Sequence, residues 1–293
     1  MKKFLKTAVK KIINFTGHDL KKTGKTNDIN LYLQRYGEES VQNKKFYDIS
    51  GGGHFKFGGG LNHPCWTNVD FMHPGTVISK RSKNTISHDL LTLEPLPIES
   101  GSAELVHSQY TIEHITDEAA AVMFKEVYRI LKSKGVFRVI VPNNELDFIA
   151  YKNNDISFFY WRHYQPYSKR LCPPSIEQVF LEHFATNAAI SHPDGSATPI
   201  DDNEFKQIFS RNTFAEAMSI CTSRCSVKKQ KLYRYNHINW WTHNKLRTML
   251  EEAGFETTYI VAPGQSSTQV MRNRAYFDRY WNNISLFVEA IKS

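Results

Sequence analysis

The stretch HFKFGGGLNHPCWTNVDF, residues 54–71, combines glycines and an acid in a pattern that suits a nucleoside. Gly58 and Gly60 follow a short apolar run, and glycine lets the backbone approach a ligand closely because it has no Cβ atom. Asp70 ends the next β-rich run, where its carboxylate can accept hydrogen bonds from two ribose hydroxyls. The phosphate-binding pattern GxxxxGK is absent, and only the GxG part of the dinucleotide pattern GxGxxG is present. The spacing therefore indicates a nucleoside site without a pyrophosphate, and the alternative is an ordinary loop.

A second acid closes the following β-rich run, in the sequence HDL at residues 88–90. The carboxylate of Asp89 can accept a hydrogen bond from an adenine amino group, while Leu90 packs on the ring. The alternative interpretation is that Asp70 and Asp89 are turn residues, which are common where strands end.

The cysteines are weak evidence for a metal. Cys221 and Cys225 are spaced so that both can face one zinc ion, but no second pair of ligands accompanies them. We therefore predict no metal site. Four cysteines in 293 residues do not form a disulfide framework, and free thiols fit a reducing cytoplasm.

Short β-rich runs broken by Gly, Pro and Asp fill residues 46–150 and surround one strong helical pattern. A helix is expected over about residues 117–132, because Ala120, Phe124 and Val127 recur on one face. A strand, this helix and the apolar strand VFRVIVP form a βαβ unit, which implies a parallel sheet. The fold class is therefore α/β, with its ligand at the carboxyl ends of the strands.

The rhythm of the sequence changes after residue 150 and divides the chain into four parts. Residues 151–235 are aromatic and basic, and we expect them to form an inserted, mostly helical cap. A helix ending near Gly254, the strand after it and the run ISLFVEAIK return to the pattern of the core. The predicted parts are a basic helix with its extension (1–45), the ligand-binding α/β core (46–150), the cap (151–235) and the C-terminal part of the core (236–293).

An ordered series of motifs runs through the predicted core. Its members are Trp66, Asn68 and Asp70; Asp89 and Leu90; Leu96 and Pro97; Leu105 and Val106; Glu113 and His114; Glu126 and Arg129; residues 131–135; Val141 and Pro142; and residues 285–290. The series resembles the class I S-adenosylmethionine-dependent methyltransferases, and is most similar to the subgroup found in bacterial surface-polysaccharide gene clusters. It departs from that subgroup at Lys134, which replaces a glycine, and at Gln109 and Tyr110, which replace a Glu and a His.

The resemblance implies a Rossmann-like sheet that binds S-adenosylmethionine and transfers its methyl group. A hydroxyl acceptor also benefits from a base that removes its proton. His114 is the first candidate because it follows the fourth strand, near the expected methyl group, and its alternative role is a helix-entry residue bonded to backbone. Tyr110 and His163, the latter in the cap, are the other catalytic candidates. The implied cofactor-binding residues are Gly58, Gly60, Asp70, Asp89, Leu90 and Ser108.

The net charge of +8 and the isoelectric point near 9.1 favour an anionic partner. We expect a cytoplasmic enzyme that O-methylates a sugar hydroxyl of a surface-glycan precursor, so the acceptor is a small molecule or glycan with negative charge. One alternative is an RNA methyltransferase, but no RNA-binding module is visible and nucleic acid is not the expected partner. The other is a catalytically silent, methyltransferase-like binding protein.

The opening sequence MKKFLKTAVKKIINFTG sets lysines against aliphatic residues at helical spacing. Two interpretations stay open, a terminal helix docked on its own domain and peripheral contact with the anionic inner face of the cell membrane. Lysines interrupt any signal-peptide core, and no apolar run is long enough to span a bilayer.

Overall fold

The computed structural model describes residues 28–49, 61, 63–71, 84–162, 175–190, 198–279 and 281–293. The basic N-terminal helix, Gly58, Gly60 and His163 lie outside these residues, so what we expect of them stays a prediction.

Within the described residues, seven strands form one mixed sheet in the order β3-β2-β1-β4-β5-β7-β6. Strands β1 to β5 run parallel to one another, and β7 runs antiparallel to both β5 and β6. The predicted α/β class is confirmed, but the prediction of a parallel sheet is wrong for β7. The strands are β1 (Phe46–Ile49), β2 (Trp66–Asp70), β3 (Thr85–Ser87), β4 (Ala103–Gln109), β5 (Leu131–Pro142), β6 (Thr257–Ile260) and β7 (Ser285–Ile291).

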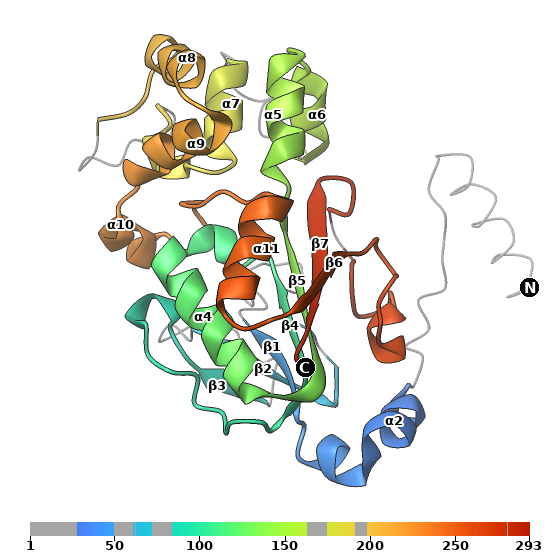
Figure 1. Cartoon of the computed structure of the whole chain (residues 1–293). Helices are drawn as coiled ribbons and strands as arrows, with labels where there is room; N and C mark the ends of the chain where they lie inside the picture. The colour runs from blue at the N-terminus through green and yellow to red at the C-terminus, as the bar shows by residue number, and fades with distance from the viewer. Residues whose placement is uncertain are drawn as a thin grey trace, which may run out of the picture.

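Helices pack against both faces of the sheet, each through its own hydrophobic cluster. Successive strand side chains point to opposite faces, so Val106 of β4 joins the cluster under α4 and α11, while Leu105 joins the cluster under α2 and η5. Figure 1 shows α4 and α11 in front of the sheet. The bounds are α2 (Ile29–Gln42), α4 (Asp117–Ile130), α11 (His243–Glu252) and the 3-10 helix η5 (Gln269–Arg272).

Helix α4 confirms the predicted amphipathic helix and ends slightly early. The Thr116 side chain caps it by accepting a hydrogen bond from the Ala119 backbone, and acids in the first turn favour the positive end of the helix dipole. The helix ends at Ile130 because Leu131 already pairs with Ala103 as part of β5.

Lys134 lies near the start of β5, where the register between β4 and β5 shifts. Its φ of 64° is in the left-handed region, which costs about 1–2 kcal/mol for a residue with a side chain. Its backbone donates a hydrogen bond to the Lys292 carbonyl at 2.8 Å, which fixes this conformation. Lys134→Gly removes this strain but adds an entropy cost of about 0.5–1 kcal/mol, because glycine loses more conformational freedom on folding. The net expectation is a rise of about 0.5–1 kcal/mol in the free energy of unfolding. Urea denaturation measures the change.

Gly135→Ala is the contrasting variant. A Cβ atom at Gly135 would lie 2.8 Å from the Lys132 carbonyl oxygen and 2.9 Å from a Leu131 methyl carbon, so we expect this variant to lose stability. A Lys134→Gly variant no more stable than the parent would contradict the inferred strain.

The helices between β5 and α11 form a cap with a hydrophobic core of its own. Phe159, Phe180 and Phe205 are fully buried in this core, and Figure 1 shows α5 to α9 grouped beyond one end of the sheet. Helix α5 begins at Asn144, so the helical cap starts earlier than the predicted boundary at residue 151. The cap contains α5 (Asn144–Lys152), α6 (Ile156–Arg162), α7 (Ile176–Glu182), the 3-10 helix η4 (Thr186–Ala188), α8 (Asp202–Arg211), α9 (Phe214–Ser223) and α10 (Val227–Leu232).

The carboxyl ends of the parallel strands face the cap. Strand β5 ends at Pro142 and leads directly into α5, and β1 to β4 end at the same edge because they run parallel to it. Two 3-10 helices begin near that edge, η1 (Leu90–Thr92) after β3 and η2 (Ile112–His114) after β4. The predicted ligand site therefore lies between the edge of the sheet and the cap.

Among the described residues, every helix is too short or too polar to cross a lipid bilayer.

Candidate functional site

Asp70 and Ser108 lie near the carboxyl ends of β2 and β4, on either side of β1. Asp70 is the last residue of β2, is 9% exposed, and accepts a hydrogen bond from the Phe71 backbone at 2.8 Å. Ser108 is fully buried and lies opposite Ile49, the last residue of β1. Its hydroxyl has no hydrogen-bond partner among the described residues, although buried polar atoms usually have one. Both side chains therefore fit a polar ligand bound across the ends of these strands.

Asp89 has a protein partner in the structure. Its two carboxylate oxygens accept hydrogen bonds from Arg234 at 2.6 and 2.8 Å, and one also accepts from the Leu91 backbone. Burial alone would raise the pKa of Asp89, but the hydrogen bonds from Arg234 and Leu91 lower it below its usual value. Leu90 begins η1 and is buried against the core of the sheet. Contact of Asp89 and Leu90 with an adenine ring stays a prediction.

Arg234 brings the cap over the ends of β2 and β3. It follows α10, and its guanidinium lies 4.2 Å from the centre of the Phe71 ring while it pairs with Asp89. Sequence reasoning missed this contact because the two ionic partners are 145 positions apart and no local pattern links them.

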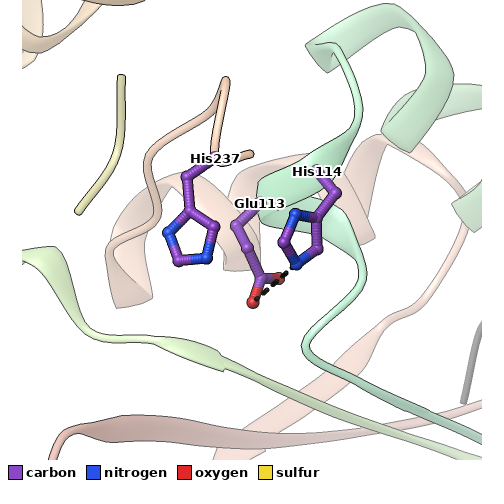
Figure 2. A group of neighbouring side chains, drawn as sticks. All are labelled: Glu113, His114 and His237. Atoms are coloured by element: carbon purple, nitrogen blue, oxygen red, sulfur yellow. Dashed lines mark ion pairs between the residues drawn. The ribbon is translucent and has the colours of Figure 1, made fainter. Parts of the chain in front are cut away.

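A second contact between the cap and the sheet edge joins Glu113, His114 and His237 (Figure 2). Glu113 and His114 belong to η2, and His237 comes from the cap segment opposite them. One possible ligand atom of each residue lies within 4.8 Å of the other two, and Nε2 of His114 is 3.8 Å from Oε1 of Glu113. Glu113 is buried, while both histidines are partly exposed. The cluster is therefore reachable from solvent through its imidazoles.

Backbone carbonyls orient both imidazoles. Nδ1 of His114 lies 3.0 Å from the Asn236 carbonyl oxygen, and Nδ1 of His237 lies 2.5 Å from that of His183. A carbonyl only accepts hydrogen bonds, so each Nδ1 must carry a proton and donate it. In the neutral imidazole Nε2 then holds the basic lone pair, and Figure 2 shows the two Nε2 atoms turned toward Glu113.

The cap also holds the backbone of η2. The Ile238 backbone donates to the Glu113 carbonyl at 2.9 Å, and the Gln230 side chain donates to the carbonyls of His114 and Asn236 at 2.9 and 2.8 Å. These bonds keep the two segments that form the cluster in register.

Tyr110 points to another part of the edge. Its φ is 54°, its hydroxyl contacts the Ser285 side chain and the Trp281 carbonyl, and its ring meets the Trp281 ring edge to face at 4.9 Å. The structure thus places Tyr110 against the start of β7, outside the cluster that contains His114.

Two features escaped the predictions made from the sequence. Strand β1 ends at Ile49, so the glycines at residues 51–53 follow it more closely in the sequence than Gly58 and Gly60 do. A strand followed directly by glycines is the pattern that indicates a nucleoside-binding loop, so residues 51–53 were the better candidates. Both glycine runs lie outside the described residues. His237 carried no signal, because it approaches Glu113 only through the fold of the cap.

The described cysteines, Cys65, Cys221 and Cys225, are free thiols. Burial raises the pKa of the Cys221 thiol to about 12, which disfavours the thiolate that zinc requires. The zinc alternative at Cys221 and Cys225 therefore gains no support.

A groove of about 820 Å³ lies between the cap and the helical layer of α4 and α11. Glu145, Trp240 and Lys245 are among the residues that line it. None of the described predicted site residues does, so this groove is separate from the cluster at the strand ends.

Residues 67–139 match a family of methyltransferase domains. The matched segment runs from β2 into β5 and contains Asp70, Asp89, Ser108 and His114. No curated protein is similar enough to the chain to count as a match.

Solved methyltransferase structures resemble the chain at low identity. A possible histamine N-methyltransferase from Thermotoga maritima is 12% identical, with a TM-score of 0.38, over 91% of this chain and 95% of that one. A methyltransferase from Archaeoglobus fulgidus is 11% identical, with a TM-score of 0.39, over 90% and 93%. PigF, solved with SAH, is 10% identical, with a TM-score of 0.38, over 85% of this chain, which spans 50% of the length of PigF.

The sheet, its edge and the family match together define the class of protein. The fold is a Rossmann-like α/β sheet with an added helical cap, and residues 67–139 within it match methyltransferase domains. The match supports an S-adenosylmethionine-dependent methyltransferase, whose cofactor supplies an electrophilic methyl group. Asp70 and the unpartnered hydroxyl of Ser108 fit this cofactor, because both present polar atoms where the strands end.

Proposed function

We propose that the protein methylates a hydroxyl of an anionic sugar acceptor, a nucleotide-linked or phosphate-linked precursor of a surface glycan. The observation that carries the proposal is the cluster of Glu113, His114 and His237 beside the end of β4. A hydroxyl is a weak nucleophile until its proton is removed, so a site for it needs basic groups at the acceptor. This cluster supplies a carboxylate and two imidazoles with basic Nε2 atoms.

The residues of the chain take separate roles in this proposal. Asp70 binds the ribose of the cofactor, and Ser108 contributes a buried hydroxyl beside it. His114 and its neighbours face the acceptor, where they promote loss of its proton. The cap segment that carries Arg234 and His237 covers the strand ends and excludes water from the aligned reactants.

A basic surface next to the cluster supports a negatively charged acceptor. Helix α10 carries Lys228, Lys229 and Lys231, and the exposed rings of Tyr233 and Tyr235 follow. Cations near exposed aromatic rings suit both the phosphate and the sugar of such a precursor. They also suit RNA, which makes an RNA methyltransferase the second candidate. Free thiols at the described cysteines agree with our proposal of a cytoplasmic location.

The test is transfer of radiolabelled methyl groups from S-adenosylmethionine to three separate pools: nucleotide-linked hexoses, neutral hexoses and bulk transfer RNA. We expect label in the nucleotide-linked hexoses, on an oxygen located by NMR. His114→Phe is expected to lower kcat by roughly 10²–10⁴-fold with donor binding unchanged, because it removes a basic group from the acceptor site. His243→Ala changes a histidine outside the cluster and should leave kcat unchanged.

Two outcomes would contradict the proposal. Label confined to transfer RNA would favour the RNA methyltransferase. Donor binding without transfer to any pool would favour the catalytically silent binding protein.

A further inference from the structure

We propose that Glu113, His114 and His237 bind a divalent transition-metal ion, zinc in the first instance. This site was not expected from the sequence, because its ligands come from two segments more than a hundred residues apart.

The donor set suits a transition metal. Zinc is bound by imidazole nitrogen and carboxylate oxygen, and two histidines with one glutamate form a known type of three-ligand zinc site. Calcium and magnesium prefer sites made of oxygen ligands alone. Two imidazoles beside Glu113 therefore favour zinc over either of them.

The spacing of the three residues requires only a small adjustment. Ligand atoms at about 2.1 Å from a tetrahedral zinc ion lie about 3.4 Å from one another. Nε2 of His114 and Oε1 of Glu113 are 3.8 Å apart, and all three ligand atoms lie within 4.8 Å of one another. Side-chain rotations that bring each pair closer by at most about 1.4 Å, the difference between 4.8 and 3.4 Å, complete the site.

The contacts around the cluster also fit metal binding. A histidine that binds a metal usually donates its other ring N–H to a carbonyl or carboxylate, which orients the ring and makes the ligating nitrogen more basic. Both His114 and His237 do so through Nδ1, to the carbonyls of Asn236 and His183. Burial of Glu113 adds to this, since a carboxylate in a low-dielectric setting attracts a cation more strongly.

Three protein ligands leave zinc at least one open position. The His114 side chain is 19% exposed, so a ligand from solvent can reach that position. With zinc bound, Glu113 and both imidazoles are ligands and no longer act as free bases, so the metal takes over that role. An acceptor hydroxyl at the open position would have its pKa lowered by the metal and would release its proton to solvent water. This role rests on the proposed function, whereas binding of the metal does not.

The experiment is calorimetric titration of the chelator-treated, dialysed full chain with zinc chloride. We expect the parent to bind one zinc ion per chain at the cluster. His237→Ala should weaken zinc binding at that site by at least about a hundredfold. Glu113→Gln, which keeps the shape of the side chain and removes its charge, provides a second variant should His237→Ala fail to fold. Cobalt added in place of zinc should give a visible absorption band in the parent that both variants lack.

His243→Ala is the matched control, because it removes a histidine that is not in the cluster. It should bind zinc as the parent does. Unchanged zinc affinity in both cluster variants, or a parent that binds no zinc at micromolar concentrations, would overturn the proposal. The titration contains neither methyl donor nor acceptor, so the absence of zinc binding would contradict the metal site and leave the proposed methylation untouched. A protein that binds zinc but transfers no methyl group would contradict the proposed methylation and leave the metal site untouched.

Discussion

Asp70→Ala is expected to weaken binding of S-adenosylhomocysteine, the demethylated cofactor, by roughly ten- to a thousandfold. Asp70 ends β2 next to β1, where a carboxylate can accept hydrogen bonds from two ribose hydroxyls. A hydrogen bond to a charged group contributes about 1.5–3 kcal/mol, and water recovers part of that when the carboxylate is removed. Because about 1.4 kcal/mol corresponds to tenfold in affinity, the loss falls in this range. Isothermal titration calorimetry measures it directly.

Asp201→Asn is the control for that experiment. Asp201 caps α8 by accepting a hydrogen bond from the Glu204 backbone at 2.8 Å, and asparagine caps a helix about as well as aspartate. We expect the control to keep both stability and affinity, and Asp70→Ala to keep its circular dichroism spectrum. Equal affinity in the parent and in Asp70→Ala would show that this acid does not hold the ribose.

Arg138→Met is expected to lower the free energy of unfolding by about 3–5 kcal/mol. Arg138 is fully buried on β5, where it pairs with Asp278 at 2.8 Å and with Glu289 of β7 at 2.8 Å, and both acids are fully buried too. Methionine fills much of the volume of the arginine side chain but leaves two buried carboxylates without this cation. Removing one partner of a buried ion pair is strongly destabilising because the remaining charge is buried and uncompensated. Thermal and urea unfolding measure the loss.

Arg224→Met tests whether burial is the cause. Arg224 pairs with Glu204 at 2.5 Å, but both side chains are about one-third exposed. An exposed pair contributes about 1 kcal/mol or less, so this variant should lose little stability. Similar losses in Arg224→Met and Arg138→Met would contradict the assigned role of burial.

The same network should make stability depend on pH in the acid range. Burial alone would raise the pKa of Glu289, but hydrogen bonds from Ser266 and Ser267, with the charge of Arg138, lower it below its usual value. A carboxyl whose pKa is lower in the folded state contributes stability above its unfolded pKa, near 4.3 for glutamate. That contribution is lost as pH falls through the folded pKa, so the difference between the parent and Arg138→Met should shrink in acid.

Local patterns in the sequence predicted most of the core. The period of Ala120, Phe124 and Val127 indicated α4, because an amphipathic helix must bury one face wherever it packs. The run at residues 285–290 likewise falls within β7. Asp70 was placed at a strand end by short-range pattern alone, and the structure confirms that position, while its contact with ribose stays a prediction.

Contacts between the cap and the core could not be predicted in this way. The prediction for Asp89 considered only an adenine ring, because nothing near Asp89 in the sequence points to Arg234. Arg138 is the one charged residue within the apolar run VFRVIVP, and its two acidic partners come from β7 and from the segment before it. The antiparallel direction of β7 was also missed, because the alternation of side chains along a strand is the same in either direction.

The sequence by itself determined the α/β class, the main helix of the core, the position of Asp70 at a strand end and that of His114 after the fourth strand. These depend on side-chain periodicity and on turn residues, which act over a few neighbouring positions. Only the tertiary structure decided that His237 meets Glu113 and His114, and that Arg234 meets Asp89. The cap and the sheet each have a hydrophobic core, and these pairs form where the polar edges of the two meet. Their partners are far apart in the sequence, so no local spacing encodes them.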